Sequence, residues 1–147
     1  MASKVHMSFL IEDLSLMLSD SDDHNVIIQV GENKNMKEFC AHSNILKARS
    51  PYFNDVKWIT KTDKKDNMFE FKLPNINPTV FEMILKYIYT SKVDLTKQTG
   101  ENILGLLVAS DELLLRKLFE YVQDHLIKNN QHGRLHAKFF NGVVGPL

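Results

Sequence analysis

The chain has 147 residues, enough for one domain with a core of its own, and 44% of them are hydrophobic. Eighteen basic and eighteen acidic side chains cancel, so the positive field that drives nucleic-acid binding is missing and we expect no nucleic-acid partner. A single cysteine, Cys40, excludes an intrachain disulfide, and no apolar run approaches the length of a membrane span. We therefore expect a protein of the cytoplasm, or of the nucleus, without a membrane partner.

The first predicted element is a helix over residues 9–18, which Ser8 caps after a flexible amino-terminus of residues 1–8. At about 100° per residue, one broad apolar stripe forms along this helix; it comprises Leu10, Ile11, Leu14, Met17 and Leu18. Phe9 and Leu16 fall together on a different side. A helix that is apolar on two sides needs two neighbours, and in a chain this short we expect one of them to be a second copy of the protein.

Two segments with alternating apolar residues, 26–30 and 36–41, predict an antiparallel β-hairpin around a turn at residues 31–35. A third strand is predicted over residues 68–73, with one buried face that comprises Phe69, Phe71 and Leu73. Helices combined with this small sheet predict the α/β (α+β) fold class.

Three longer helices are predicted in the second half of the chain. Asn77 caps a helix that opens on Pro78, Gly100 precedes the next helix, and Asp111 caps a last helix over residues 112–128. The apolar side of this last helix comprises Leu114, Leu115, Leu118, Phe119, Val122 and Leu126.

Two other segments are less regular. Asp94 and Leu95 form a short link, for which one small strand is an option. Residues 129–147 contain helix-breaking glycines and a proline, but also several apolar residues. The sequence leaves three alternatives for this tail: packing on the domain, extending an interface, or having no fixed structure.

The most informative segment is residues 39–53, which runs from a strand end into two short helical turns. Ser50 followed by Pro51 is typical of an N-cap and a first helical position. The order of residues resembles the hallmark of the BTB/POZ domain, F-x-A-H followed by x-x-L-x-x-x-S-x-x-F, and is matched here by Phe39, Ala41, His42, Leu46, Ser50 and Phe53.

Two further motifs follow in the family's order. Residues 81–90 are similar to its F-x-x-x-L-x-Y-x-Y-T-G helix, with Ser91 at the usual glycine, and residues 106–113 are similar to L-L-x-A-A-x-x-L. The resemblance covers residues 9–128 and implies the BTB/POZ fold, a small three-stranded sheet flanked by helical hairpins. The chain also resembles fungal BTB-domain-containing proteins.

This resemblance implies a protein-interaction module. Family members generally form homodimers through the first helix, which in this chain offers Phe9, Leu10, Ile11, Leu14, Leu16 and Met17. Many members also serve as substrate adaptors for cullin-3 ubiquitin ligases, so cullin-3 and ubiquitination substrates are candidate partners. The cullin-facing segment would comprise Tyr52, Phe53, Val56, Trp58 and Ile59, although residues 54–66 lack the hydrophobic-x-Glu pattern of many adaptors.

One alternative within the family stays open, and one subclass of the family is disfavoured. The chain is also compatible with a dimerising regulatory fragment that captures longer BTB proteins without binding cullin. BTB domains of zinc-finger repressors carry an Asp and an Arg in a charged pocket, and Asn25 and Ser43 occupy those positions here. That departure argues against the co-repressor pocket.

Catalytic and metal-binding functions find little support. We expect His42 to make structural hydrogen bonds and Cys40, placed on the same strand face, to be an inert, half-buried thiol. His132 and His136 are four residues apart, but Gly133 interrupts the helix that a metal pair would need. We therefore expect no enzyme, no catalytic residue, no metal and no cofactor.

Overall fold

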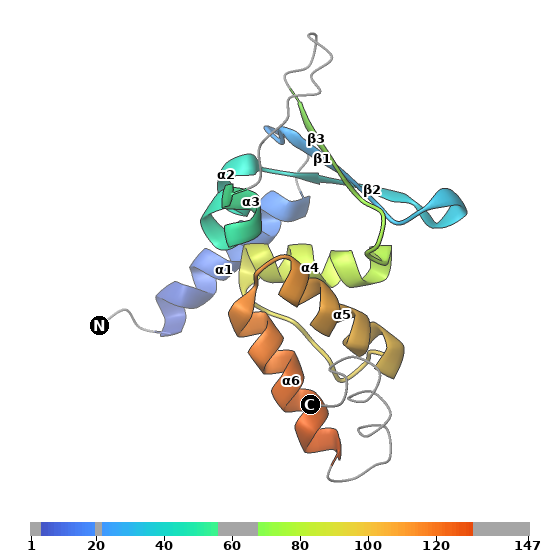
Figure 1. The fold of residues 1–147 in the computed structure, drawn as a ribbon. Coiled ribbons are helices and arrows are strands. Elements are labelled where there is room, and N and C mark those ends of the chain that lie inside the picture. Colours follow the sequence, from blue (N-terminus) through green and yellow to red (C-terminus); the bar gives the residue numbers. More distant parts are fainter. Residues whose placement is uncertain (1–3, 20–21, 56–67, 131–147) are drawn as a thin grey trace.

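The computed structural model describes residues 4–19, 22–55 and 68–130 (Figure 1). Its elements, in chain order, are α1 (Lys4–Ser19), β1 (Val26–Val30), a 3-10 turn η1 (Asn33–Asn35), β2 (Lys37–Ala41), α2 (Ser43–Arg49), α3 (Pro51–Asp55), β3 (Phe69–Leu73), α4 (Pro78–Thr90), α5 (Gly100–Glu112) and α6 (Arg116–Asn130). Among these residues, none of the helices is both long and apolar enough to cross a membrane.

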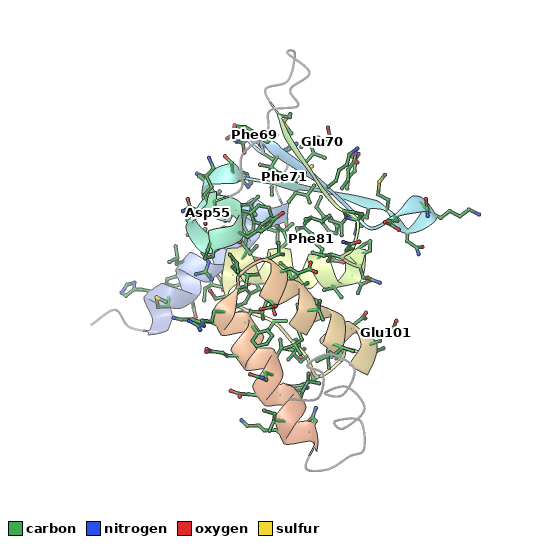
Figure 2. All side chains as sticks on the ribbon, viewed as in Figure 1. Asp55, Phe69, Glu70, Phe71, Phe81 and Glu101 are labelled. Carbon is green, nitrogen blue, oxygen red and sulfur yellow. The ribbon has the colours of Figure 1, made fainter. Side chains whose placement is uncertain are left out.

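The three strands form one sheet in the order β2-β1-β3. The predicted hairpin of β1 and β2 is confirmed, with Ile28 opposite Phe39, whereas β3 pairs with β1 in parallel and places Phe71 beside Ile28. Alternation along β1 buries Val26, Ile28 and Val30 completely, because successive side chains of a strand point to opposite faces. Figure 2 shows the β3 rings of Phe69 and Phe71 near the α2 and α3 end of the sheet.

Helix α4 lies between the sheet and the pair of α5 and α6 (Figure 1). Its start follows the prediction, because the Asn77 side chain accepts a hydrogen bond from the Thr79 N–H at 2.8 Å and Pro78 occupies the first turn. The ring of Phe81 meets that of Phe39 edge-on, with centroids 5.1 Å apart, and joins α4 to the sheet. This central helix is therefore the element on which the sheet, α1 and α5 pack, and α6 packs on α5.

The boundary between α5 and α6 differs from the prediction. Thr99 caps α5, and Asp111 lies inside this helix instead of capping the next one. The chain turns at Leu114, whose φ of 56° is in the left-handed region. The Leu115 N–H donates to the Ser110 carbonyl at 2.8 Å and the Leu114 N–H donates to the Asp111 carbonyl at 3.1 Å, which is a Schellman-type helix end.

Two consequences of this turn were not expected. Leu114 is 51% exposed, so its placement on the buried side of the last helix was wrong. It also occupies the left-handed position at which helices usually have glycine, since a side chain there costs about 1–2 kcal/mol.

Three smaller predictions also need correction. Helix α1 begins at Lys4, so residues 4–8 are helical and Ser8 is not its cap. Residues Asp94 and Leu95 form no strand. Instead, the Asp94 carboxylate accepts hydrogen bonds from the backbone N–H and the hydroxyl of Thr96, and these bonds lower the pKa of Asp94.

Candidate interaction surface

Helix α1 has no fully buried side chain among residues 6–19. It packs mainly on α4, and its amino-terminal half extends beyond the rest of the domain (Figure 1). The exposed fractions of its apolar side chains are 52% for Met7, 57% for Phe9, 53% for Leu10 and 68% for Leu16. An exposed apolar patch of this kind marks an interaction site in many proteins. We call these four residues the α1 face.

The six residues predicted for the dimer interface divide into two groups. Phe9, Leu10 and Leu16 belong to the α1 face, whereas Ile11, Leu14 and Met17 are half-buried. Met7 was missed because the helix was expected to begin only at residue 9. The second apolar side that the sequence indicated is thus exposed in the single chain.

The six hallmark residues lie together inside the domain. All are buried, with the exposed fraction at most 8%; they are Phe39, Ala41, His42, Leu46, Ser50 and Phe53. The Ser50 hydroxyl donates to the Leu113 carbonyl at 2.9 Å and accepts from the Phe53 N–H at 3.4 Å. This hydroxyl therefore connects the start of α3 to the turn between α5 and α6.

His42 makes the structural hydrogen bonds that were expected. Its backbone N–H donates to the Tyr89 hydroxyl oxygen at 2.9 Å, and its Nδ1 lies 2.6 Å from the same oxygen. The Tyr89 hydroxyl therefore donates its proton to Nδ1, which leaves Nε2 to donate to the Asp22 carbonyl at 3.4 Å. Burial raises the pKa of Tyr89 to about 12, although the bond from the His42 backbone opposes the shift.

Cys40 does not share an environment with His42. Its side chain is exposed, so the prediction of a half-buried thiol was wrong. His42 is buried and precedes the first residue of α2, so the expected common strand face was also wrong. Within the described part of the chain no group of three metal-ligating side chains occurs. His132 and His136 lie outside the described residues.

The predicted cullin-facing segment is only partly described. Phe53 has no exposed surface, so it cannot contact a partner, and its ring packs edge-on against Phe71 with centroids 5.7 Å apart. Tyr52 is half-buried. Val56, Trp58 and Ile59 lie outside the described residues.

A groove of about 480 Å³ lies beside α3. Its lining includes Pro51, Leu114 and Phe119, together with the charged residues Asp111 and Arg116. This groove was not expected from the sequence, because helical periodicity placed Leu114 on a buried helix side. A leucine just after a helix end, where glycine is preferred, was the available signal.

The position of the co-repressor pocket holds a neutral pair. The Asn25 amide donates to the Ser43 hydroxyl at 2.8 Å, and the Ser43 N–H donates to the Asn25 carbonyl oxygen at 2.8 Å. The adjoining hollow, of about 480 Å³, also has Asp22 and Asp23 in its lining. Asn25 and Ser43 therefore bind each other, and neither offers a charge to a partner.

A family model described as the BTB/POZ domain matches residues 14–130. The chain belongs to the BTB/POZ domain family. It is 26% identical to Kelch-like protein 41a of Danio rerio over 143 residues, which are 96% of this chain and 23% of that protein. It is 35% identical to Kelch-like protein 40a of Danio rerio over 98 residues, which are 64% of this chain and 15% of that protein.

Solved structures agree with this assignment. The BTB domain of zebrafish PATZ1 matches with a TM-score of 0.65 and 27% identity, over 87% of this chain and 97% of that domain. The BTB domain of human gigaxonin matches in fold with a TM-score of 0.63 and 23% identity, over 85% of this chain and 94% of that domain. This BTB/POZ chain is a protein-interaction module and spans less than a quarter of the length of the Kelch-like relatives.

Proposed function

We propose that this BTB/POZ chain forms a homodimer through the α1 face. The proposal rests on one side of α1 that the domain does not cover. On this side the side chains of Phe9 and Leu16 are 57% and 68% exposed. In a two-fold symmetric interface, the same patch of both copies is covered, so every residue contributes twice. Sedimentation velocity on the purified chain tests the proposal; a monomer at tens of micromolar would contradict it.

We further propose that the dimer acts as an adaptor or scaffold and that cullin-3 binds at the groove beside α3. The Kelch-like relatives support an adaptor class, and Leu114 gives the groove an exposed apolar side chain. Leucine at a left-handed backbone position is strained, and strain of this kind gathers at functional sites. A partner that covers Leu114 would offset its cost.

Binding of purified cullin-3 to the immobilised chain tests this second proposal. We expect Leu114→Asp to abolish binding, because a carboxylate would then replace the apolar contact. Aspartate is also among the residues best tolerated at a positive φ. Leu16→Asp, the matched control on α1, should retain the cullin contact of each protomer. Absence of binding by the unaltered chain would leave the scaffold role alone.

We propose that these functions involve binding without catalysis. His42 of the hallmark and Tyr89 of the second motif are both buried and are bonded to each other, which supports a structural role for both. A substrate-binding site is expected to lie in a partner or in further domains like those of the longer relatives. Affinity capture followed by identification of the bound proteins tests this expectation.

A further inference from the structure

A hollow of about 560 Å³ lies between the last turn of α4, the link that follows this helix, and α6. The rings of Tyr87 from α4 and Tyr121 from α6 line it, and Val93 of the link adds an aliphatic side chain. Tyr121 is 52% exposed and Tyr87 is half-buried. The hollow therefore offers an occupant two tyrosine rings, and tyrosine is enriched among the residues that dominate protein interfaces.

Positive charge gathers around this hollow, although the whole chain is neutral. Lys86 and Lys92 line it, and both are exposed. Among its described lining residues Asp94 alone is acidic, and the Asp94 carboxylate already accepts two hydrogen bonds from Thr96. Lys97 and Lys86 act on the same carboxylate electrostatically. Three ammonium groups therefore lie near one carboxylate, and we call this surface the basic hollow.

Arg49 adds a further positive charge and fixes the turn at the end of α4. Its Nε donates a hydrogen bond to the Ile88 carbonyl at 3.0 Å, and its Nη2 donates to the Ser91 hydroxyl. Ser91 lines the basic hollow and has a φ of 59°, a left-handed position at which helices usually have glycine. The guanidinium carbon lies 5.8 Å from the centre of the Tyr87 ring, within the range of a cation–π contact. A residue of α2 thus keeps two lining residues of the basic hollow in place.

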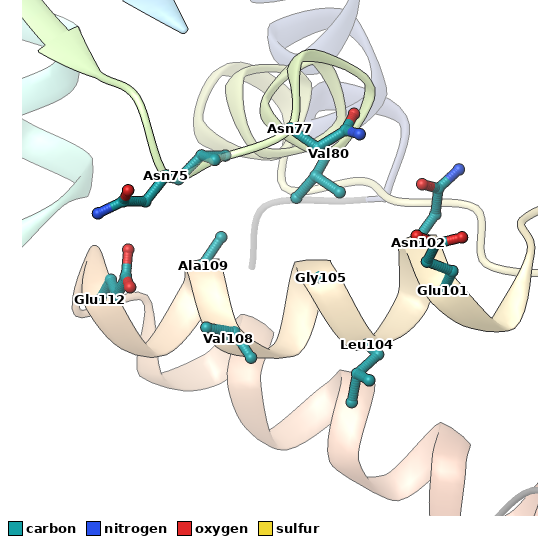
Figure 3. A pocket seen from close by; sticks show the side chains of 11 residues that line it. Asn75, Asn77, Val80, Glu101, Asn102, Leu104, Gly105, Val108, Ala109 and Glu112 are labelled. Carbon is teal, nitrogen blue, oxygen red and sulfur yellow. The ribbon is translucent and has the colours of Figure 1, made fainter. Parts of the chain in front are cut away.

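A second hollow, along α5, has the opposite charge. Its volume is about 330 Å³, and its lining includes Glu101 and Glu112 but no lysine or arginine among the described residues (Figure 3). Both hollows also have apolar side chains in their linings. The sign of the charge therefore distinguishes them, and an acidic occupant is expected only in the basic hollow.

We propose that the basic hollow binds an acidic segment of a partner protein. Carboxylates of the segment lie beside Lys86 and Lys92, and one of its apolar side chains lies against Tyr87 and Tyr121. Exposed ion pairs contribute little singly, so contact with the rings provides most of the affinity and the lysines select acidic sequences. A free anion would use the lysines alone, whereas a peptide also covers the rings.

This binding is independent of the dimer and of cullin-3. The basic hollow shares no described lining residue with the α1 face or with the groove beside α3. Loss of either proposed function would therefore leave the acidic segment its binding site.

Titration of the ¹⁵N-labelled full-length chain with a synthetic peptide tests the proposal. The probe is the capped peptide Gly-Glu-Asp-Phe-Asp-Glu-Gly, and the control is Gly-Gln-Asn-Phe-Asn-Gln-Gly, which keeps the ring but lacks the charges. We expect the acidic peptide at millimolar concentration to shift the amide signals of Tyr87, Lys92 and Tyr121. Signals of Leu104 and Val108, which line the hollow along α5, should not move.

Three variants locate the contact. Lys92→Glu should weaken binding about five- to thirtyfold, because it replaces the attraction of one ion pair by a repulsion of similar size. Lys34→Glu is the matched control, since it makes the same change of charge at an exposed lysine of η1, outside the basic hollow, and it should have little effect. Tyr121→Ala should weaken binding about fivefold or more through loss of the ring. All three positions are exposed, so folding should be retained.

Four results would overturn the proposal. One is an absence of shifts with the acidic peptide, or equal shifts with the amide peptide. The second is an equal loss of binding in Lys92→Glu and Lys34→Glu, because the attraction would then come from the overall charge. The third is the same set of shifts with inorganic phosphate alone, because the occupant would then be a free anion. The last is a shift of these signals on dilution without peptide, because a second copy of the chain would then occupy the hollow.

Discussion

Leu16 provides the sharpest test of the dimer. Its side chain is 68% exposed in the single chain, so Leu16→Asp should change the free energy of unfolding of the protomer by about 0.5 kcal/mol at most. Full burial of a leucine contributes about 1.5–3 kcal/mol, and two thirds of this amount is about 1–2 kcal/mol. Two-fold symmetry doubles the loss to about 2–4 kcal/mol per dimer.

A loss of this size corresponds to a Kd of the dimer that is about 30 to 700 times higher, since 1.4 kcal/mol is a factor of ten. The carboxylates of the variant would raise it further, because they lose hydration at the interface. Sedimentation velocity over a concentration series measures the Kd, and urea unfolding at low concentration measures the protomer's stability.

Leu114→Asp is the matched control, because it introduces the same charge at a leucine that is 51% exposed on the turn between α5 and α6, outside α1. It should leave the Kd of the dimer unchanged. A dimer that tolerates Leu16→Asp with less than a threefold change in Kd would refute the reasoning, as would equal effects of the two variants.

Three further predictions concern the buried hydrogen bonds and a helix cap. Tyr89→Phe should lower the free energy of unfolding by about 1–3 kcal/mol in urea, because the His42 N–H and Nδ1 lose their partner. The pKa of Tyr89 rises from 10.0 to about 12 on folding, so its neutral form stabilises the folded state below pH 10. About 2 kcal/mol should be lost as the pH rises from 10 to 12 in the unaltered chain but not in Tyr89→Phe; equal pH profiles would contradict this assignment. Ser50→Ala should cost about 1–3 kcal/mol, since the buried Leu113 carbonyl loses its donor; a neutral result in thermal unfolding would argue against this link. Asn77→Ala should cost about 1 kcal/mol through loss of the α4 cap, and Asn77→Ser, which keeps a capping oxygen, should restore most of it.

Local chemistry made much of the fold predictable. The period of two in residues 26–30 and the Asn77-Pro78 pair each fix an element through residues close together in the chain. The hallmark of residues 39–53 predicted the fold through its resemblance to the BTB/POZ family, whereas its spacing alone indicates only one strand end and two helical turns. The positions of Phe9 and Leu16 in the sequence also predicted the second apolar side of α1.

Other properties depend on residues that are far apart in sequence, and only the tertiary structure decided them. The parallel pairing of β3 with β1, the bond between His42 and Tyr89, and the exposure of Cys40 each depend on the neighbours that folding supplies. The end of α5 was misplaced because helical periodicity continues through Leu114, whereas the packing of α6 on α5 requires the chain to turn there. Periodicity can identify an apolar side of a helix, but which side remains uncovered is determined by the rest of the domain.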